Sequence, residues 1–240
     1  MTLRTATRLG LGLLACHNLA QNYLLNERGY VAGNLAVSGA LVAIGHSAGL
    51  AWDEMGLHPA RSRRGLRMGA WASAGAAAAA LLALGHPAIR NYLLDERAAP
   101  TPGTSVWRRA LVRFPLGTAL FEEIAFRGVI PALLRREHRP LTAETLSAGV
   151  FALWHLIPTY RALASNPLGM AMAPRRRALA AAVGSAAAGV FGLGFSWMRR
   201  RSGTVVAPWL THASLNTLSY LAGVAAWRMR NAGDYRRGQS

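Results

Sequence analysis

The sequence contains no lysine, a single cysteine and few acidic residues. All 27 basic residues are therefore arginine, and they face 10 acidic residues, which gives a formal net charge of +17. Cys16 has no second cysteine in the chain with which to form a disulfide bond. A positive charge of this size first suggests a nucleic-acid partner. We expect no nucleic acid, because the arginines cluster between apolar segments, where membrane helices carry their flanking charges.

Charged residues are absent from two long stretches. Residues 29–52 and 68–89 contain no Asp, Glu, Lys or Arg, and a helix needs about 20 residues to cross the hydrocarbon core of a bilayer. The chain is 52% hydrophobic and 15% charged, and no alternating pattern indicates a transmembrane barrel. We therefore predict an all-α, polytopic transmembrane bundle of about seven to eight spans. Seven candidates are residues 9–25, 30–52, 68–89, 108–134, 141–158, 178–198 and 204–227.

The spans suggest three parts of the chain. We expect N-terminal transmembrane helices over residues 1–106, a catalytic helical core over residues 107–227 and a basic tail over residues 228–240. Residues 159–177 contain several arginines and two prolines, which predicts a loop or a re-entrant segment. Cys16 follows a short apolar run that resembles a lipoprotein signal, but we favour its place inside the first span.

Three charges interrupt the fourth expected span. Glu123 and Arg127 are four residues apart, so on a helix they share a face and can pair. Glu122 is rotated by about 100° from Glu123 and needs a partner from another span. A charge inside a membrane is costly and usually faces a bundle interior or a wet cavity. For this motif alone, a purely structural cluster of buried charges is an equally good interpretation.

The expected partners are imidazoles on later spans. His155 follows Phe151 by four residues, and His212 precedes Asn216 by four residues on one helical face. Measured from the arginine-rich end of each span, Glu122, His155 and His212 lie at depths of about 21, 24 and 16 Å. These depths allow the three side chains to meet in one cavity.

A carboxylate, two imidazoles and a carboxamide are suited to hydrolysis. The carboxylate can take a proton from water, while an imidazole and a carboxamide stabilise an oxyanion. Glu122, His155 and His212 could instead bind zinc as ligands with one open position. The sequence leaves a metal-free glutamate mechanism and a zinc-dependent mechanism both open.

The three motifs EEIAFRG, FALWH and HASLN occur in this order on successive expected spans. Together they resemble the CPBP family of CAAX proteases and bacteriocin-processing enzymes, also called the Abi family or type II CAAX prenyl endopeptidases. The resemblance covers about residues 107–225. It implies an intramembrane endopeptidase that cleaves a peptide or protein tail at the membrane.

The resemblance also implies a role for each motif residue. Glu122 would be the general base, and His155 would position the water or bind metal. His212 and Asn216 would form the oxyanion site or supply further metal ligands. The remaining motif residues would support the site structurally, and these are Glu123, Arg127 and Phe151.

Two other classes of function fit the same residues. A non-catalytic scaffold or immunity protein could keep the charged core for packing, and a small transporter could use Glu122 and the histidines as a proton relay. Neither class needs a peptide-sized groove at Glu122. In each case we expect an integral protein of the plasma membrane of a bacterium. The substrate, its prenylation, the orientation and the oligomeric state are not encoded in these motifs.

Overall fold

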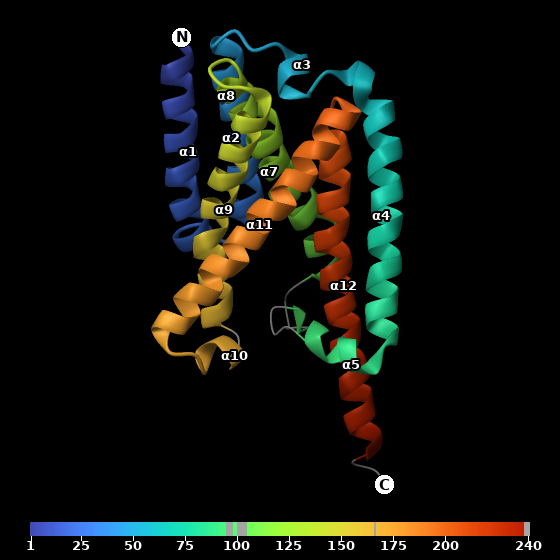
Figure 1. The fold of residues 1–240 in the computed structure, drawn as a ribbon. Coiled ribbons are helices and arrows are strands. Elements are labelled where there is room, and N and C mark those ends of the chain that lie inside the picture. The colour runs from blue at the N-terminus through green and yellow to red at the C-terminus, as the bar shows by residue number, and fades with distance from the viewer. Residues whose placement is uncertain (95–97, 100–104, 166, 238–240) are drawn as a thin grey trace.

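The computed structural model describes residues 1–94, 98–99, 105–165 and 167–237, and over these residues the chain is all-α (Figure 1). The long helices are α1 (Leu3–Tyr23), α2 (Glu27–Ser47), α4 (Ser62–Gly85), α9 (Pro140–Ala164), α11 (Pro174–Ser202) and α12 (Val206–Arg237). A further continuous helical stretch consists of α6 (Val106–Arg108), η4 (Arg109–Leu120), α7 (Phe121–Glu123), η5 (Ile124–Val129) and α8 (Ile130–Arg135). Short connecting elements are α3 (Trp52–Met55), η1 (Pro59–Arg61), α5 (Pro87–Arg90), η2 (Asn91–Leu93) and α10 (Pro167–Met170).

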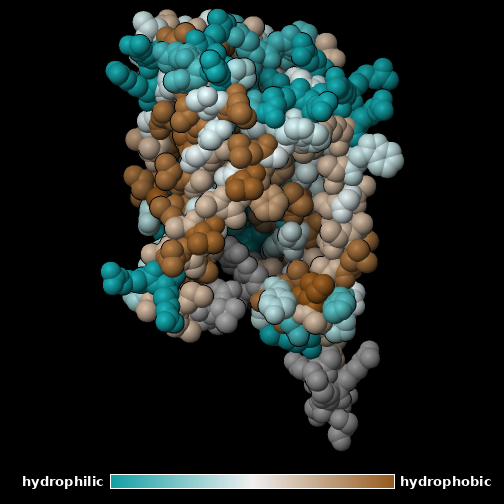
Figure 2. Space-filling view, viewed as in Figure 1, coloured by the Kyte–Doolittle hydropathy of each residue, from teal (hydrophilic) through white to brown (hydrophobic). Residues whose placement is uncertain are grey.

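Each of the seven expected spans coincides with one of these long helical stretches, so the all-α prediction is confirmed. Within the described residues, two stretches are long and apolar enough to cross a membrane, namely Pro59–Gly85 and Pro174–Ser202. They correspond to the expected spans 68–89 and 178–198. On the face shown in Figure 2, hydrophobic residues form a band across the middle, and hydrophilic residues gather most densely at the upper end and in smaller groups at the lower end. The total of seven to eight spans stays a prediction.

Two helices extend past the ends of the expected spans. The segment predicted as a loop or a re-entrant segment begins as helix, because α9 continues through Pro158 to Ala164 before the short α10. A proline removes one backbone hydrogen bond and often kinks a helix, but it does not always end it. At the other boundary, α12 extends as far as Arg237, so most of the expected basic tail is helical.

The helical stretch that carries both carboxylates is not α-helical throughout. Arg109–Leu120 and Ile124–Val129 form wider π-helical turns, and Pro115 lies in the first of them. Proline lacks the N–H that a regular α-helix needs at that position. π-Helical turns are rare in proteins, but those that occur are often found at functional sites. The short α-helical turn Phe121–Glu123 therefore holds the two carboxylates between two irregular segments.

Glycines let α4 pack closely against α12. A Cβ atom on Gly65 would lie 2.4 Å from Cγ2 of Thr204, and one on Gly69 would lie 2.8 Å from Cβ of Leu210. Small residues at such contacts allow two helix backbones to approach within a membrane. This contact fixes the position of α12, which carries His212.

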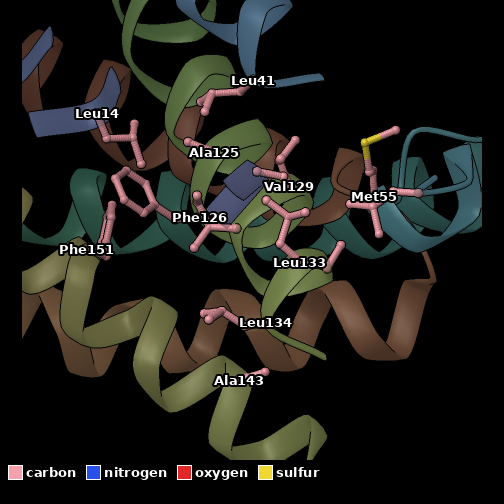
Figure 3. Close-up of a cluster of buried hydrophobic side chains, with 14 of the residues drawn as sticks. Leu14, Leu41, Met55, Ala125, Phe126, Val129, Leu133, Leu134, Ala143 and Phe151 are labelled. Carbon is pink, nitrogen blue, oxygen red and sulfur yellow. The ribbon is translucent and has the colours of Figure 1, made fainter. Parts of the chain in front are cut away.

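The main hydrophobic core surrounds η5 and α8 (Figure 3). Phe126 and Leu133 are fully buried there, with Leu14 from α1, Leu41 from α2 and Phe151 from α9. The rings of Phe126 and Phe151 meet edge to face with centroids 5.1 Å apart. This packing orients α9 against the carboxylate-bearing stretch and so determines the direction in which His155 points.

Candidate active site

The two oxygens of the Glu122 carboxylate have different surroundings. Only 5% of Glu122 is exposed, and Nε1 of Trp154 donates a 3.1 Å hydrogen bond to Oε1. Oε2 is buried and has no hydrogen-bond partner among the described residues. A buried polar atom without a hydrogen-bond partner costs free energy. We therefore expect a further hydrogen-bond donor at Oε2.

Two imidazoles face this unpartnered oxygen. Nε2 of His155 lies 4.0 Å from Oε2 of Glu122, and Nε2 of His212 lies 3.8 Å from it. Both separations are too long for a direct hydrogen bond, and a water molecule can bridge polar groups across a gap of this kind. The sequence prediction that Glu122, His155 and His212 meet is therefore confirmed by the geometry.

The other ring nitrogens decide which protons the imidazoles carry. Nδ1 of His155 lies 2.9 Å from the carbonyl oxygen of Phe151, and Nδ1 of His212 lies 2.8 Å from Oε1 of Glu123. Carbonyl and carboxylate oxygens only accept hydrogen bonds, so each Nδ1 donates. In the neutral rings, both Nε2 atoms then carry lone pairs. Three electron-pair donors thus converge without a proton between them.

Glu123 and Arg127 form the predicted pair within one helical stretch. Nη1 of Arg127 lies 3.1 Å from Oε1 of Glu123, and the two side chains are 1% and 0% exposed. The guanidinium lies over the ring of Phe151, 4.0 Å from its centroid, and 5.1 Å from the centroid of Phe195. A Cβ atom on Gly192 would come within 2.8 Å of Nη2 of Arg127. The glycine on α11 therefore makes the space that the buried guanidinium occupies.

Glu123 has a second contact that the helical spacing did not predict. The oxygen that accepts from Arg127 also accepts from Nδ1 of His212. The ring of His212 stacks on Phe195 at 5.1 Å and an interplanar angle of 18°. One carboxylate thus neutralises the buried cation and fixes the orientation of an imidazole that faces Glu122.

Glu122 and His155 line a cavity of about 590 Å³ that also contains Trp154 in its wall. Asn216 lines a neighbouring cavity of about 530 Å³. The two cavities share the side chains of Glu27, Arg113 and Thr118 in their walls. Asn216 therefore lines the cavity next to the one that contains Glu122 and His155, and its role stays a prediction. Within the described part of the chain its side chain has no hydrogen bond.

Trp154 is a site residue that the sequence reasoning missed. It is 4% exposed, and its ring packs against Phe121 and Phe126 at centroid distances of 5.2 and 5.7 Å. Its position directly before His155 was visible in the motif FALWH. The direction of the indole N–H depends on how α9 is rotated about its axis, and only the packing determines that rotation.

The three donor atoms lie further apart than the ligands of a bound zinc ion do. Ligand atoms 2.0–2.2 Å from a tetrahedral zinc ion lie about 3.3–3.6 Å from one another, whereas Oε2 of Glu122 lies 4.0 Å from Nε2 of His155 and 3.8 Å from Nε2 of His212. Among the described residues, no group of three His, Cys, Asp or Glu side chains is placed to hold a metal ion. We therefore derive no chemical step through a metal.

Fold and site together define an all-α protein with a buried cluster of carboxylates and imidazoles. A family model described as "Type II CAAX prenyl endopeptidase Rce1-like" matches residues 104–218, which include all three motifs. Over this segment the chain is similar to the Rce1-like type II CAAX prenyl endopeptidase family, and this family is membrane-embedded. The predicted resemblance is thereby confirmed. No curated protein and no solved structure matched the chain.

Proposed function

We propose that the protein is an intramembrane endopeptidase in which Glu122 activates a water molecule. The observation that carries this proposal is the unpartnered, buried Oε2 of Glu122, with Nε2 of His155 at 4.0 Å and Nε2 of His212 at 3.8 Å. Three lone-pair donors attract a molecule that brings protons, and water brings two. The match of residues 104–218 to a family of CAAX protease-type enzymes supports the same reaction class.

The geometry supports a simple sequence of proton transfers. One hydrogen of the water bonds to Oε2 of Glu122 and the other to Nε2 of His155, which leaves an oxygen lone pair for the peptide carbonyl. As the oxygen attacks the carbonyl carbon, the proton passes to Oε2. Glu122 then delivers this proton to the nitrogen of the leaving amine, and the carbon–nitrogen bond breaks. The carboxylate is regenerated, and the products are one acid and one amine.

Two residues of α12 are candidates for the oxyanion site. Asn216 has an amide N–H without a partner among the described residues, and a free N–H donor can stabilise the charge of a tetrahedral intermediate. His212 is held by Glu123 and presents Nε2 to the same region. His212 can orient the water or, when protonated, donate to the oxyanion. The shared walls of the two cavities allow one peptide to reach both Glu122 and Asn216.

The experiment is a comparison of the termini of membrane proteins in cells that carry the native gene, Glu122→Gln or Glu137→Gln. Glu137 is a surface carboxylate paired with Arg4, so its variant is a matched control. We expect new termini in the native and control cells and none with Glu122→Gln. If all three cell lines have the same termini, the peptidase proposal fails, and a non-catalytic membrane scaffold becomes the better interpretation.

A further inference from the structure

A second cavity with a distinct chemistry lies on α4, away from the carboxylate cluster. Its volume is about 600 Å³, and it is lined by Arg63, Arg64, Arg67, Met68 and Trp71. At 100° per residue these five positions fall within about 140° of the helix circumference. Three guanidinium groups and one indole therefore share one face of a single helix.

The three arginines of this cavity differ from five other arginines of the chain, because those five form ion pairs with acidic residues. None of the three has a carboxylate partner among the described residues. By contrast, Asp53, Glu54, Glu137 and Glu144 each contact at least one other arginine, and the arginines involved are Arg4, Arg61, Arg135, Arg136 and Arg200. These four carboxylates are therefore paired with other arginines. Arg63, Arg64 and Arg67 form a positive patch that no carboxylate among the described residues neutralises.

The length of α4 places this patch at the surface of the bilayer. The helix has 24 residues, or about 36 Å at 1.5 Å per residue, and the hydrocarbon core is about 30 Å thick. Its arginine-bearing end therefore extends into the headgroup region. Trp71 is 78% exposed and lies about 12 Å along the axis from Arg63, at the depth where tryptophans gather in membrane proteins. Further along, Leu81 and Leu82 are 70% and 75% exposed, as expected for lipid-facing side chains.

We propose that this cavity binds one anionic phospholipid. The phosphate contacts Arg63, Arg64 and Arg67, because guanidinium groups bind phosphate oxygens in paired hydrogen bonds. The glycerol region lies at Trp71, and an acyl chain follows the apolar outer face of α4. This site is separate from the proposed peptidase site and does not depend on its activity.

The test measures binding of phosphatidylglycerol and phosphatidylcholine to the purified, delipidated full chain by native mass spectrometry. The two lipids differ in net charge and can carry the same acyl chains. The unaltered protein should bind one phosphatidylglycerol at a concentration at least tenfold below that for phosphatidylcholine. Replacing Arg63, Arg64 and Arg67 together by Gln should weaken phosphatidylglycerol binding roughly 100-fold, at about fivefold for each basic residue near an anionic surface.

A charge-matched control replaces Arg139, Arg175 and Arg176 by Gln, since these arginines are exposed and have no carboxylate partner among the described residues. The control should change phosphatidylglycerol binding by less than about twofold. Equal losses in both triple variants would show a non-specific effect of net charge and would overturn the proposal. A preference for phosphatidylglycerol that survives in the first variant would overturn it too.

Two further measurements test the proposal even if the triple Gln variant of Arg63, Arg64 and Arg67 does not fold. In the triple Arg→Lys variant the charge is kept, and binding should fall by less than tenfold, with 0.5 M NaCl weakening it further. Inorganic phosphate should not displace the lipid at millimolar concentration. Displacement by phosphate at the same concentration as the lipid would assign the cavity to a free anion and overturn the assignment to a phospholipid.

Discussion

The hydrogen bond from Trp154 to Glu122 gives the sharpest test of the proposed mechanism. Trp154→Phe keeps an aromatic ring in the core and removes the N–H that donates to Oε1. A hydrogen bond to a charged group contributes about 1.5–3 kcal/mol, which corresponds to roughly 10- to 150-fold in rate if the transition state uses all of it. We therefore expect kcat to fall 10- to 100-fold while KM stays within about threefold, because Trp154 acts on the carboxylate.

The melting temperature separates this role from packing. Loss of the N–H leaves Oε1 of Glu122 without its donor, so kcat should fall even at temperatures where the variant is fully folded. A tryptophan that only fills space would lower the melting temperature and leave kcat of the folded variant unchanged.

Two matched variants make the result decisive. Benzothienylalanine at position 154 replaces the N–H by sulfur and keeps the two-ring shape, so it should reproduce the loss of kcat with little change in melting temperature. Trp209→Phe removes an indole N–H that bonds to the carbonyl oxygen of Pro115 at 2.8 Å, and it should leave kcat within about threefold of the native value. An unchanged kcat in both position-154 variants would refute the positioning of Glu122 by Trp154. The assay uses a peptide substrate found by the comparison of termini.

Four further results are expected. Arg127→Met leaves the buried Glu123 without its counter-cation, although His212 still donates to it, and chemical unfolding should show a loss of about 3–5 kcal/mol. Gly65→Ala inserts a methyl group into the contact with α12, and the same measurement should show a loss of about 1–3 kcal/mol. Hydrogen bonds from Arg136 lower the pKa of Glu54 below its ordinary value of 4.5. The resulting stabilisation is complete above about that pH and is lost as the pH falls through the lowered pKa, so acid melting curves of the native protein and Glu54→Gln should converge. Because the donor atoms do not match zinc geometry, chelators should leave peptidase activity within about twofold of its starting value, as measured with the same peptide.

The controls for these variants are exposed residues. Arg139→Met removes a surface arginine and should cost less than about 0.5 kcal/mol. Gly12→Ala has open space around the new methyl group and should not destabilise the protein. An equal loss of unfolding free energy in a control and in its partner variant would contradict the contact assigned to that partner. Acid melting curves of the native protein and Glu54→Gln that stay parallel would contradict the pairing of Glu54 with Arg136. Restoration of a chelated enzyme by zinc alone would show that the cavity closes around a metal.

The sequence predicted the parts of the site that depend on spacing along one helix. The pair between Glu123 and Arg127 follows from a separation of four residues and is present at 3.1 Å. Depth along each span also placed His155 and His212 near Glu122, because a helix crossing a membrane has a fixed rise per residue.

The sequence did not predict contacts that depend on helix rotation or on irregular turns. The bonds from Trp154 to Glu122 and from His212 to Glu123 join different helices, and their formation depends on the packing of whole faces. The sequence also did not predict that α9 continues past Pro158 into the segment expected as a loop or a re-entrant segment, because a proline alone does not end a helix. Asn216 shares a helix face with His212, yet a four-residue separation did not put both side chains in one cavity.

The π-helical segment Arg109–Leu120 also has a consequence for insertions and deletions. A π-helical turn contains one more residue than an α-helical turn of the same span, since its hydrogen bonds join residues five apart. Deletion of one residue between Arg113 and Leu120 would remove the extra residue of one such turn and rotate the preceding side chains by about 100° relative to the carboxylates. Arg109 and Arg113 are then expected to leave the cavity walls, while Glu122 and Glu123 stay anchored by α9 and α12. A change of a single codon could therefore alter what the cavity admits without altering its carboxylates.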